Sequence, residues 1–416
     1  MMRIDRRRFL AWAACGSALG SLAASGAEGK RPRILLRSSW QTVNIGDIAH
    51  TPGVLAVLEK HLPEAEVRLW PSKVDNGVDV LLRRRFPKLE IVQGAEAVKA
   101  AMAESDFLLH GSGPSLVAAK DVARWRAETG KPYGIYGITL PVVEPQTIDL
   151  ISGARFCFFR DSVSLALARA SGANCPIMEF GPDGAFGVDL RNDDAATTFL
   201  REHGLQEGRF LCCIGRLRHT PYWKIHGRAM TAEDERKHLI NEAKKEQDHA
   251  PLREAIAAIV RQTGMKVLVC PEDQSQMAVG KEMLVAPLPD DVKAAVVWRE
   301  DYWLTDEAVS TYIRSAGLFG NEMHSPIMCV GHGVPAIVCR WAEQTSKGVM
   351  WKDIGLGDWL FDMDKEEDRG RVPAAVLAMA RDPEAARRRA REAQQFVRRR
   401  QAETMEILHQ QVSKAG

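Results

Sequence analysis

The sequence has little net charge and no cysteine pair of the Cys-x-x-Cys kind. Lysine and arginine (56) nearly balance aspartate and glutamate (54), so the formal net charge is only +2. No overall field therefore favours nucleic acid or an anionic membrane as a partner. The eight cysteines include the adjacent Cys212 and Cys213, which lie in an apolar run where small thiols are commonly buried. This usage argues against a disulfide framework or a zinc site, and we expect neither a metal nor a cofactor.

A long hydrophobic run is also missing. The segment "DRRRFLA" pairs arginines with Phe9 and Leu10, and the small-residue stretch after it, residues 11–24, is shorter than the about 20 residues of a membrane span. This pattern is typical of a twin-arginine export signal, with a small-residue cleavage site near Ala27. We expect the twin-arginine machinery as a partner, membrane contact only through this segment, and a periplasmic or cell-envelope location. An uncleaved anchor is the alternative.

Short apolar runs alternate with amphipathic helical stretches over the rest of the 416 residues. Predicted strands in the first half are "RILLRSS", "EVRLWP", "LEIVQ", "DFLLHGSG", "YGIYGIT" and "ARFCFFR". In the second half they are "RFLCCIG", "MKVLVC", "EMLVAP", "AGLFGNE" and "VPAIVC". Apolar strands separated by helices indicate parallel sheets covered on both faces. The fold class is therefore α/β, with two Rossmann-like domains facing a cleft.

The domain boundaries follow from breaks in this rhythm. After a signal segment at residues 1–29, we expect the first domain at 30–190 and the second at 191–416. A polar insertion at about 216–248 interrupts the second domain. The last helix is predicted to begin after Asp382, since aspartate caps helices and proline follows at the first helical position.

Polar residues follow several predicted strands of the first domain, at the edge where open α/β sheets bind ligands. Asn44, Gly46 and Asp47 form a turn after the first strand, with simple capping of the next helix as the alternative role. Gly111 and Gly113 form a tight turn after the fourth, with Pro114 beginning a helix, and such a turn brings backbone N–H groups close to an anion. Arg160 ends an apolar strand, where it would bind a ligand or an ion-pair partner.

The second domain offers a basic loop and a lone histidine at the same edge. Arg216, Arg218 and His219 follow its first strand, with Trp223 as a stacking surface; a solvated loop is the alternative. His324 directly precedes a helix that Ser325 would cap. The partial positive charge of that helix end favours neutral imidazole, which can exchange a proton with a substrate.

The order of these segments resembles the polysaccharide pyruvyl transferase family. The similar segments are "NIGDIA", the "GSG" turn, "FFRDSVSLALARASG", "GPDGAF" and "MHSPIMCVGHGVPAIV" followed by Lys347, which together span nearly the whole mature chain. The resemblance implies a GT-B-like enzyme that transfers a pyruvyl group from phosphoenolpyruvate to two hydroxyls of a polysaccharide or oligosaccharide acceptor, with no cofactor.

The resemblance also implies roles for individual residues. His324 and Asp47 would be catalytic. The donor's anionic groups would contact Arg160, Arg216, Arg218, His219 and Lys347. The substrate cleft would be lined by Asn44, Gly46, Gly111, Ser112, Gly113, Asp183, Trp223, Glu322 and Ser325.

Glu322 departs from the family pattern, which typically has an arginine two residues before the histidine. Because a carboxylate repels an anionic donor, either the basic loop binds the donor or the donor is not phosphoenolpyruvate. Two further functions stay open on this sequence. One is an exported, non-catalytic glycan-binding member of the same fold, and the other is a sugar-nucleotide-dependent glycosyltransferase.

Overall fold

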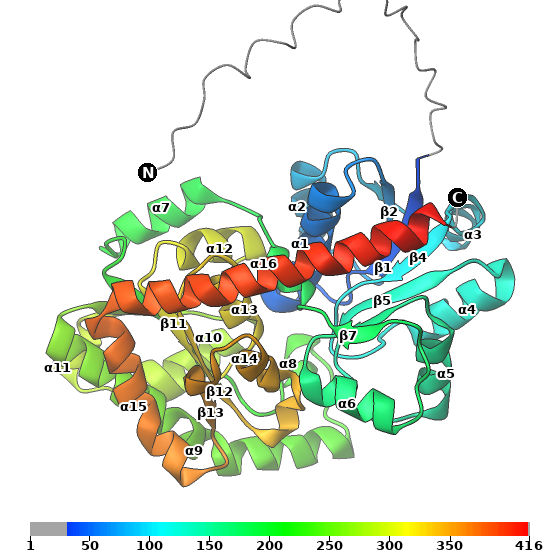
Figure 1. Cartoon of the computed structure of the whole chain (residues 1–416). Helices are drawn as coiled ribbons and strands as arrows, with labels where there is room; N and C mark the ends of the chain where they lie inside the picture. Colours follow the sequence, from blue (N-terminus) through cyan, green and yellow to red (C-terminus); the bar gives the residue numbers. More distant parts are fainter. Residues whose placement is uncertain (1–30, 415–416) are drawn as a thin grey trace, which may run out of the picture. The chain divides into compact units, whose positions relative to one another are not determined.

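Two parallel β-sheets organise the computed structural model, which describes residues 31–414 (Figure 1). The seven-stranded sheet has the order β3-β2-β1-β4-β5-β6-β7, and the six-stranded sheet the order β10-β9-β8-β11-β12-β13. The first contains β1 (Arg33–Ser38), β2 (Glu66–Pro71), β3 (Glu90–Ile91), β4 (Phe107–His110), β5 (Tyr133–Ile138), β6 (Cys157–Phe159) and β7 (Met178–Phe180). The second contains β8 (Phe210–Ile214), β9 (Lys266–Val269), β10 (Val296–Trp298), β11 (Gly317–Gly320), β12 (Ala336–Arg340) and β13 (Leu360–Asp362).

Helices connect the strands and cover the sheets. With the first sheet go α1 (Ile45–His61), α2 (Val78–Arg85), α3 (Ala95–Glu104), α4 (Ala119–Thr129), α5 (Pro145–Gly153) and α6 (Ser162–Ala170). Between the sheets along the chain lie η1 (Gly184–Gly187) and α7 (Asp193–Glu202). With the second go α8 (Tyr222–Ile225), α9 (Ala232–Thr263), α10 (Gln276–Val279), the π-helix η2 (Gly280–Val285), α11 (Asp290–Lys293), α12 (Thr305–Tyr312) and α13 (His324–Gly331). The chain ends with η3 (Ala342–Gln344), η4 (Lys347–Val349), α14 (Met350–Asp353), η5 (Gly357–Trp359), α15 (Glu366–Arg381) and α16 (Pro383–Ser413).

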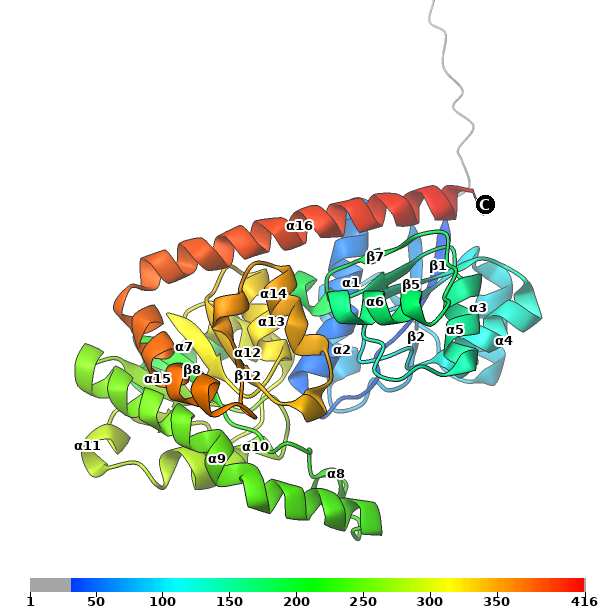
Figure 2. The ribbon, with the colours of Figure 1, turned by 60° about the horizontal axis from the view of Figure 1, so that its bottom comes forward.

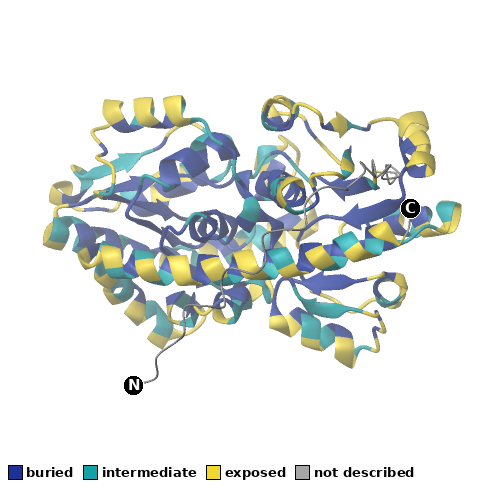
Figure 3. Ribbon diagram, turned by 45° about the horizontal axis from the view of Figure 1, so that its top comes forward, coloured by how far each residue is buried: buried dark blue, intermediate teal, exposed yellow. Residues whose placement is uncertain are grey.

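The prediction of two Rossmann-like units with parallel sheets is confirmed. The middle of each central strand is apolar and buried on both faces, as in β1 with Ile34 and Leu36 and β8 with Cys212 and Cys213. Figure 3 shows these strands buried, while the outer helices carry exposed residues on one side only. Burial of apolar side chains, at roughly 25 cal/mol per Å², is the main force that holds such sheets between their helices.

The strand prediction was wrong at "EMLVAP". Residues 280–285 form the π-helix η2, which continues α10, and the sheet takes Val296–Trp298 as β10 instead. Met283 and Leu284 are buried, whereas Lys281 and Glu282 are exposed. A run of three apolar residues fits one side of a helix as well as a strand, so the pattern did not distinguish the two. The short strands β7 and β13 had no comparable signal.

The prediction for the last helix is confirmed, since Asp382 caps α16 by accepting from the Ala385 N–H. This helix runs from the second sheet back to the first (Figure 2). Arg400 donates to the carbonyl of Phe180 at 2.6 Å and pairs with Glu179 at 3.1 Å, both in β7. The helix therefore packs on both sheets.

Backbone pairing joins the segment before α1 to the loop after β9. The Ile45 N–H donates to the Glu272 carbonyl at 2.9 Å, and the Gln274 N–H donates to the Val43 carbonyl at 3.3 Å. Gly46 lies so close to α13 that a Cβ atom built on it would be 2.1 Å from the His324 Cβ. Only glycine fits there, so α1 and α13 begin in direct contact.

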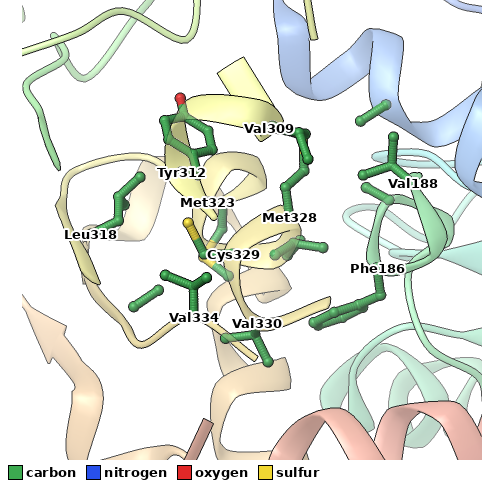
Figure 4. Packing of buried hydrophobic residues seen from close by; sticks show 14 of the residues in the cluster. Phe186, Val188, Val309, Tyr312, Leu318, Met323, Met328, Cys329, Val330 and Val334 are labelled. Carbon is green, nitrogen blue, oxygen red and sulfur yellow. The ribbon is translucent and has the colours of Figure 1, made fainter. Parts of the chain in front are cut away.

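The segment around η1 packs against the other side of α13. Figure 4 shows Phe186 and Val188 beside Met328 and Val330 of the helix. Gly331 of α13 is equally close, because a Cβ atom there would be 2.4 Å from the Phe186 carbonyl oxygen. Helix α13 is thus held between the two sheets by packing on both sides.

Within residues 31–414 no helix combines the length and hydrophobicity needed to cross a membrane. The twin-arginine segment and Cys15 lie outside the described residues, so export remains a prediction.

A first prediction concerns the tight contact of α1 with η1. A Cβ atom on Gly53 would be 2.0 Å from the Gly184 carbonyl oxygen, whereas Gly370 in α15 has no neighbour within 4 Å of that position. We expect Gly53→Ala to lower the free energy of unfolding by about 3 kcal/mol or more, because backbone must move. Gly370→Ala should raise it by about 0.5–1 kcal/mol through helix propensity. Urea denaturation measures both, and equal stability of the two variants would contradict the packing.

Candidate active site

The turn after β1 places two chemically active side chains on α1. Asn44 caps the helix, which was the alternative role for this turn, and its Oδ1 accepts from the N–H groups of Gly46 (2.7 Å) and Asp47 (3.1 Å). His50 follows Asp47 by three residues, so both side chains project from the same side of the helix. The Asp47 Oδ1 lies 3.9 Å from the His50 Nε2.

The turn after β4 forms backbone hydrogen bonds within the first sheet and contacts His50. The Gly111 N–H donates to the Arg37 carbonyl and the Gly113 N–H to the Gly137 carbonyl, so neither points to an anion. The Ser112 Oγ lies 3.0 Å from the His50 Nδ1. The helix predicted at Pro114 was wrong, because α4 begins at Ala119.

Asp183 is the buried anion of this half of the site. It pairs with the Arg160 Nη1 at 2.6 Å and with the His50 Nδ1 at 3.0 Å, and none of the three side chains is exposed. Burial alone would raise the pKa of Asp183, but His50 and Arg160 together hold it well below its usual range. Arg160 also donates to Thr139, which leaves its buried Nη2 without a partner among the described residues.

The second sheet contributes Glu272 and His324. Helix α13 begins at His324, one residue earlier than predicted, and Ser325 does not cap it. Instead the Glu272 carboxylate lies at the helix start, accepting from the Ser325 N–H at 2.6 Å and contacting the His324 Nδ1 at 3.2 Å. Burial, together with the charge of Lys347, holds the pKa of His324 well below its usual range, so its imidazole is neutral.

The two halves meet where the histidine rings touch. The centroids of His50 and His324 are 5.0 Å apart in an edge-to-face arrangement. In each ring Nδ1 faces a carboxylate, so in the neutral ring the proton lies on Nδ1 and Nε2 is an acceptor. Both Nε2 atoms are buried and have no hydrogen-bond partner among residues 31–414.

Glu322 is buried, and its charge is compensated. Its Oε1 accepts from Gln276 at 2.6 Å and its Oε2 from Arg216 at 3.2 Å. Arg216 of the basic loop therefore lies at the site, where it forms an ion pair with Glu322.

The rest of the basic loop lies away from the two histidines. Arg218 is held by Asp248, Glu343 and Asp364, at 2.7 to 3.2 Å. The His219 N–H donates to Asn241, and Trp223 is buried with its edge toward His238. The structure thus does not bring Arg218, His219 or Trp223 together with His324.

Lys347 is the unpaired cation of the site. No carboxylate of the described residues lies within ion-pair distance of its Nζ, although Glu322 and Glu272 act on it electrostatically. Burial lowers its pKa, and the Arg160 guanidinium lowers it further. A half-buried, unpaired ammonium beside an unsatisfied guanidinium is an arrangement suited to an anionic ligand.

Sequence reasoning missed His50 and Glu272. The signal for His50 was its spacing of three from Asp47 on a predicted helix. The signal for Glu272 was its place after the strand "MKVLVC", at the same sheet edge as His324.

A second prediction concerns Asp183. Asp183→Asn leaves the buried guanidinium of Arg160 uncompensated, so we expect a loss of about 3–5 kcal/mol in the free energy of unfolding at pH 7. The pKa of Asp183 in the folded protein lies below its unfolded value of about 3.9. The stability that the ionised carboxylate contributes is therefore fully present above about pH 3.9 and is lost as the pH falls through the folded-state pKa. The gap between wild type and variant, measured by urea denaturation, should narrow by about 1 kcal/mol at pH 3. An unchanged gap would contradict an ionised Asp183.

Comparisons with solved structures show the same fold at low identity. A UDP-GlcNAc 2-epimerase from Methanocaldococcus jannaschii is 12% identical, with a TM-score of 0.52, over 83% of this chain and 92% of that one. S. aureus MnaA, solved with UDP, is 10% identical, with a TM-score of 0.52, over 87% and 90%. A trehalose 6-phosphate synthase from Burkholderia multivorans is 7% identical, with a TM-score of 0.51, over 93% and 100%.

A search of curated proteins finds no match to the sequence. The model of the family described as polysaccharide pyruvyl transferase matches residues 44–343, which include both histidines, Asp183, Arg160 and Glu272. The match supports a transferase that modifies polysaccharides, on a fold shared with GT-B-type enzymes. The chain belongs to the polysaccharide pyruvyl transferase family.

Proposed function

We propose that the protein transfers a pyruvyl group from phosphoenolpyruvate to two hydroxyls of a cell-surface glycan. The observation that carries this proposal is the unsatisfied Arg160 Nη2 and unpaired Lys347 in the same buried site as a neutral His324. In a member of this family, such a site suits a donor with a phosphate and a carboxylate.

Arg160 and Lys347 would bind the negatively charged groups of the donor. Arginine presents parallel N–H donors that fit phosphate or carboxylate oxygens, and a buried position strengthens each contact. Glu322 does not oppose this binding strongly, because Arg216 and Gln276 already compensate its carboxylate. This arrangement favours phosphoenolpyruvate over the alternatives in which Glu322 excludes an anionic donor.

The reaction requires one proton transfer at the donor carbon. His324 Nε2 accepts the proton of the first sugar hydroxyl, whose oxygen bonds to the central carbon of the donor, and the methylene gains a proton to become methyl. The proton that His324 accepted supplies this methyl hydrogen. The second hydroxyl then bonds to the same carbon and displaces phosphate, which leaves with the electron pair of the broken C–O bond and takes up the proton of the second hydroxyl. The products are a cyclic ketal and inorganic phosphate.

The acceptor sugar would bind at an aromatic rim beside the site. Tyr222 is 39% exposed, and Gln41 links its hydroxyl to Asp47. Trp40 is partly exposed, and its indole N–H donates to the Ser112 carbonyl at 2.7 Å. Aromatic rings of this kind pack against the apolar faces of sugars while their polar tips stay hydrogen-bonded.

Export completes the proposal. The segment "DRRRFLA" directs the folded chain to the periplasm or cell envelope, where its acceptor glycan lies. Fractionation of cells that express the full chain tests this point, and a chain found only in the cytosol would overturn it.

A third prediction tests catalysis with the full chain. Phosphoenolpyruvate and glycan acceptors should give phosphate and acid-labile pyruvate in equal amounts. His324→Gln should lower kcat at least about 100-fold, because it removes the proton acceptor. His203→Gln, at the exposed end of α7, is the control and should keep full activity. Glycan binding without phosphate release would replace the transferase by a glycan-binding protein.

A fourth prediction tests the donor site by calorimetry. Lys347→Met should weaken phosphoenolpyruvate binding about 10- to 150-fold, the range for one lost charged contact. Lys352→Met, on the exposed side of α14, should bind as the wild type does. Equal binding by both variants would remove Lys347 from the donor site, and a response only to nucleotide sugars would favour glycosyl transfer.

A further inference from the structure

The geometry points to a divalent-metal site formed by Asp47, His50 and His324. Each side chain offers one ligand atom, and these atoms all lie within 4.8 Å of one another. Two imidazoles and one carboxylate are a common ligand set for divalent transition metals, with positions left open for water or substrate. Zinc is the metal we assign first, because imidazole nitrogen suits it well.

The unpartnered nitrogens require a positive neighbour. His50 and His324 each direct Nδ1 to a carboxylate, so in the neutral rings both Nε2 atoms present lone pairs and cannot hydrogen-bond to each other. Both atoms are buried without a partner. A buried acceptor that nothing bonds to destabilises the folded protein. A single cation between the rings satisfies both.

A second side chain also contacts each proposed ligand on the side away from the metal and fixes its orientation. Asp183 contacts the Nδ1 of His50 at 3.0 Å, and Glu272 contacts the Nδ1 of His324 at 3.2 Å. Gln41 donates to Asp47 Oδ2, which leaves Oδ1 facing His50. A carboxylate behind each histidine is the usual support of a metal ligand, since it fixes the tautomer and raises the basicity of the ring.

The distances suit a metal with modest adjustment. The 3.9 Å between Asp47 Oδ1 and His50 Nε2 lies within the span of two metal–ligand bonds of about 2.1 Å. Binding would draw the farthest pair together by about 1 Å, which small side-chain rotations supply.

The metal would place positive charge near Glu322, where the family pattern has an arginine. The carboxylates of Glu322, Glu272, Asp183 and Asp47 surround the two histidines. With a metal bound, His324 would hold the metal, and a water on the metal would supply the proton acceptor that His324 supplies in the metal-free protein. Metal binding itself does not depend on pyruvyl transfer.

The test measures metal, not activity. The full chain, purified without a polyhistidine tag, is stripped with chelator and titrated with ZnCl₂ or MnCl₂ alone, with mass-spectrometric counting of bound metal after desalting. We expect one equivalent. Asp47→Asn, His50→Gln and His324→Gln should each weaken binding at least about 100-fold, and Glu272→Gln about 10- to 100-fold. His249→Gln is the matched control, since His249 is also buried with a free Nε2 but has no carboxylate behind it.

The possible outcomes test the metal site and the proposed function independently of each other. No bound metal, or equal affinity in all variants, overturns the site even if phosphate is released. One equivalent of metal without phosphate release overturns pyruvyl transfer and leaves the site intact. Asp47→Asn keeps the test decisive if a histidine variant unfolds, because Asp47 is partly exposed and circular dichroism can verify that variant's fold.

Discussion

The pairing of the segment before α1 with the loop after β9 is the contact on which the site depends. Two backbone hydrogen bonds bring Ile45 against Glu272 and Val43 against Gln274, and the missing side chain of Gly46 lets α13 begin in contact with α1. Asp47 and His50 therefore stand beside groups from a different sheet. The candidate active site is an interface within one chain, and neither sheet contains it alone.

Burial then decides the chemistry of that interface. Asp183 stays ionised because Arg160 and His50 surround it, and Glu272 fixes the proton of His324 on Nδ1, the nitrogen that it contacts. Water is largely excluded, so each remaining unpaired group acts at full strength. Lys347 and the free edge of Arg160 favour anions, while the two bare imidazole nitrogens favour a cation or a proton. A donor with anionic oxygens and an acceptor with hydroxyl protons fits both preferences.

The sheet-edge rule located much of the site from the sequence. It found Asp47, Arg160 and His324 because each follows an apolar strand, and such loops converge in any doubly wound sheet. It failed for Arg218, whose three carboxylate partners come from distant segments that no local pattern connects. His50 was missed because it lies inside an apolar helix. The π-helix at residues 280–285 was not predicted, because three consecutive apolar residues fit a strand equally well.

A crystal structure of the protein soaked with phosphoenolpyruvate tests the central claim most directly. We expect donor density in contact with the Arg160 Nη2 and the Lys347 Nζ, with the donor's methylene facing the histidines of α1 and α13. Donor density at another place, or a structure in which His50 and His324 stand apart with water between them, would contradict it.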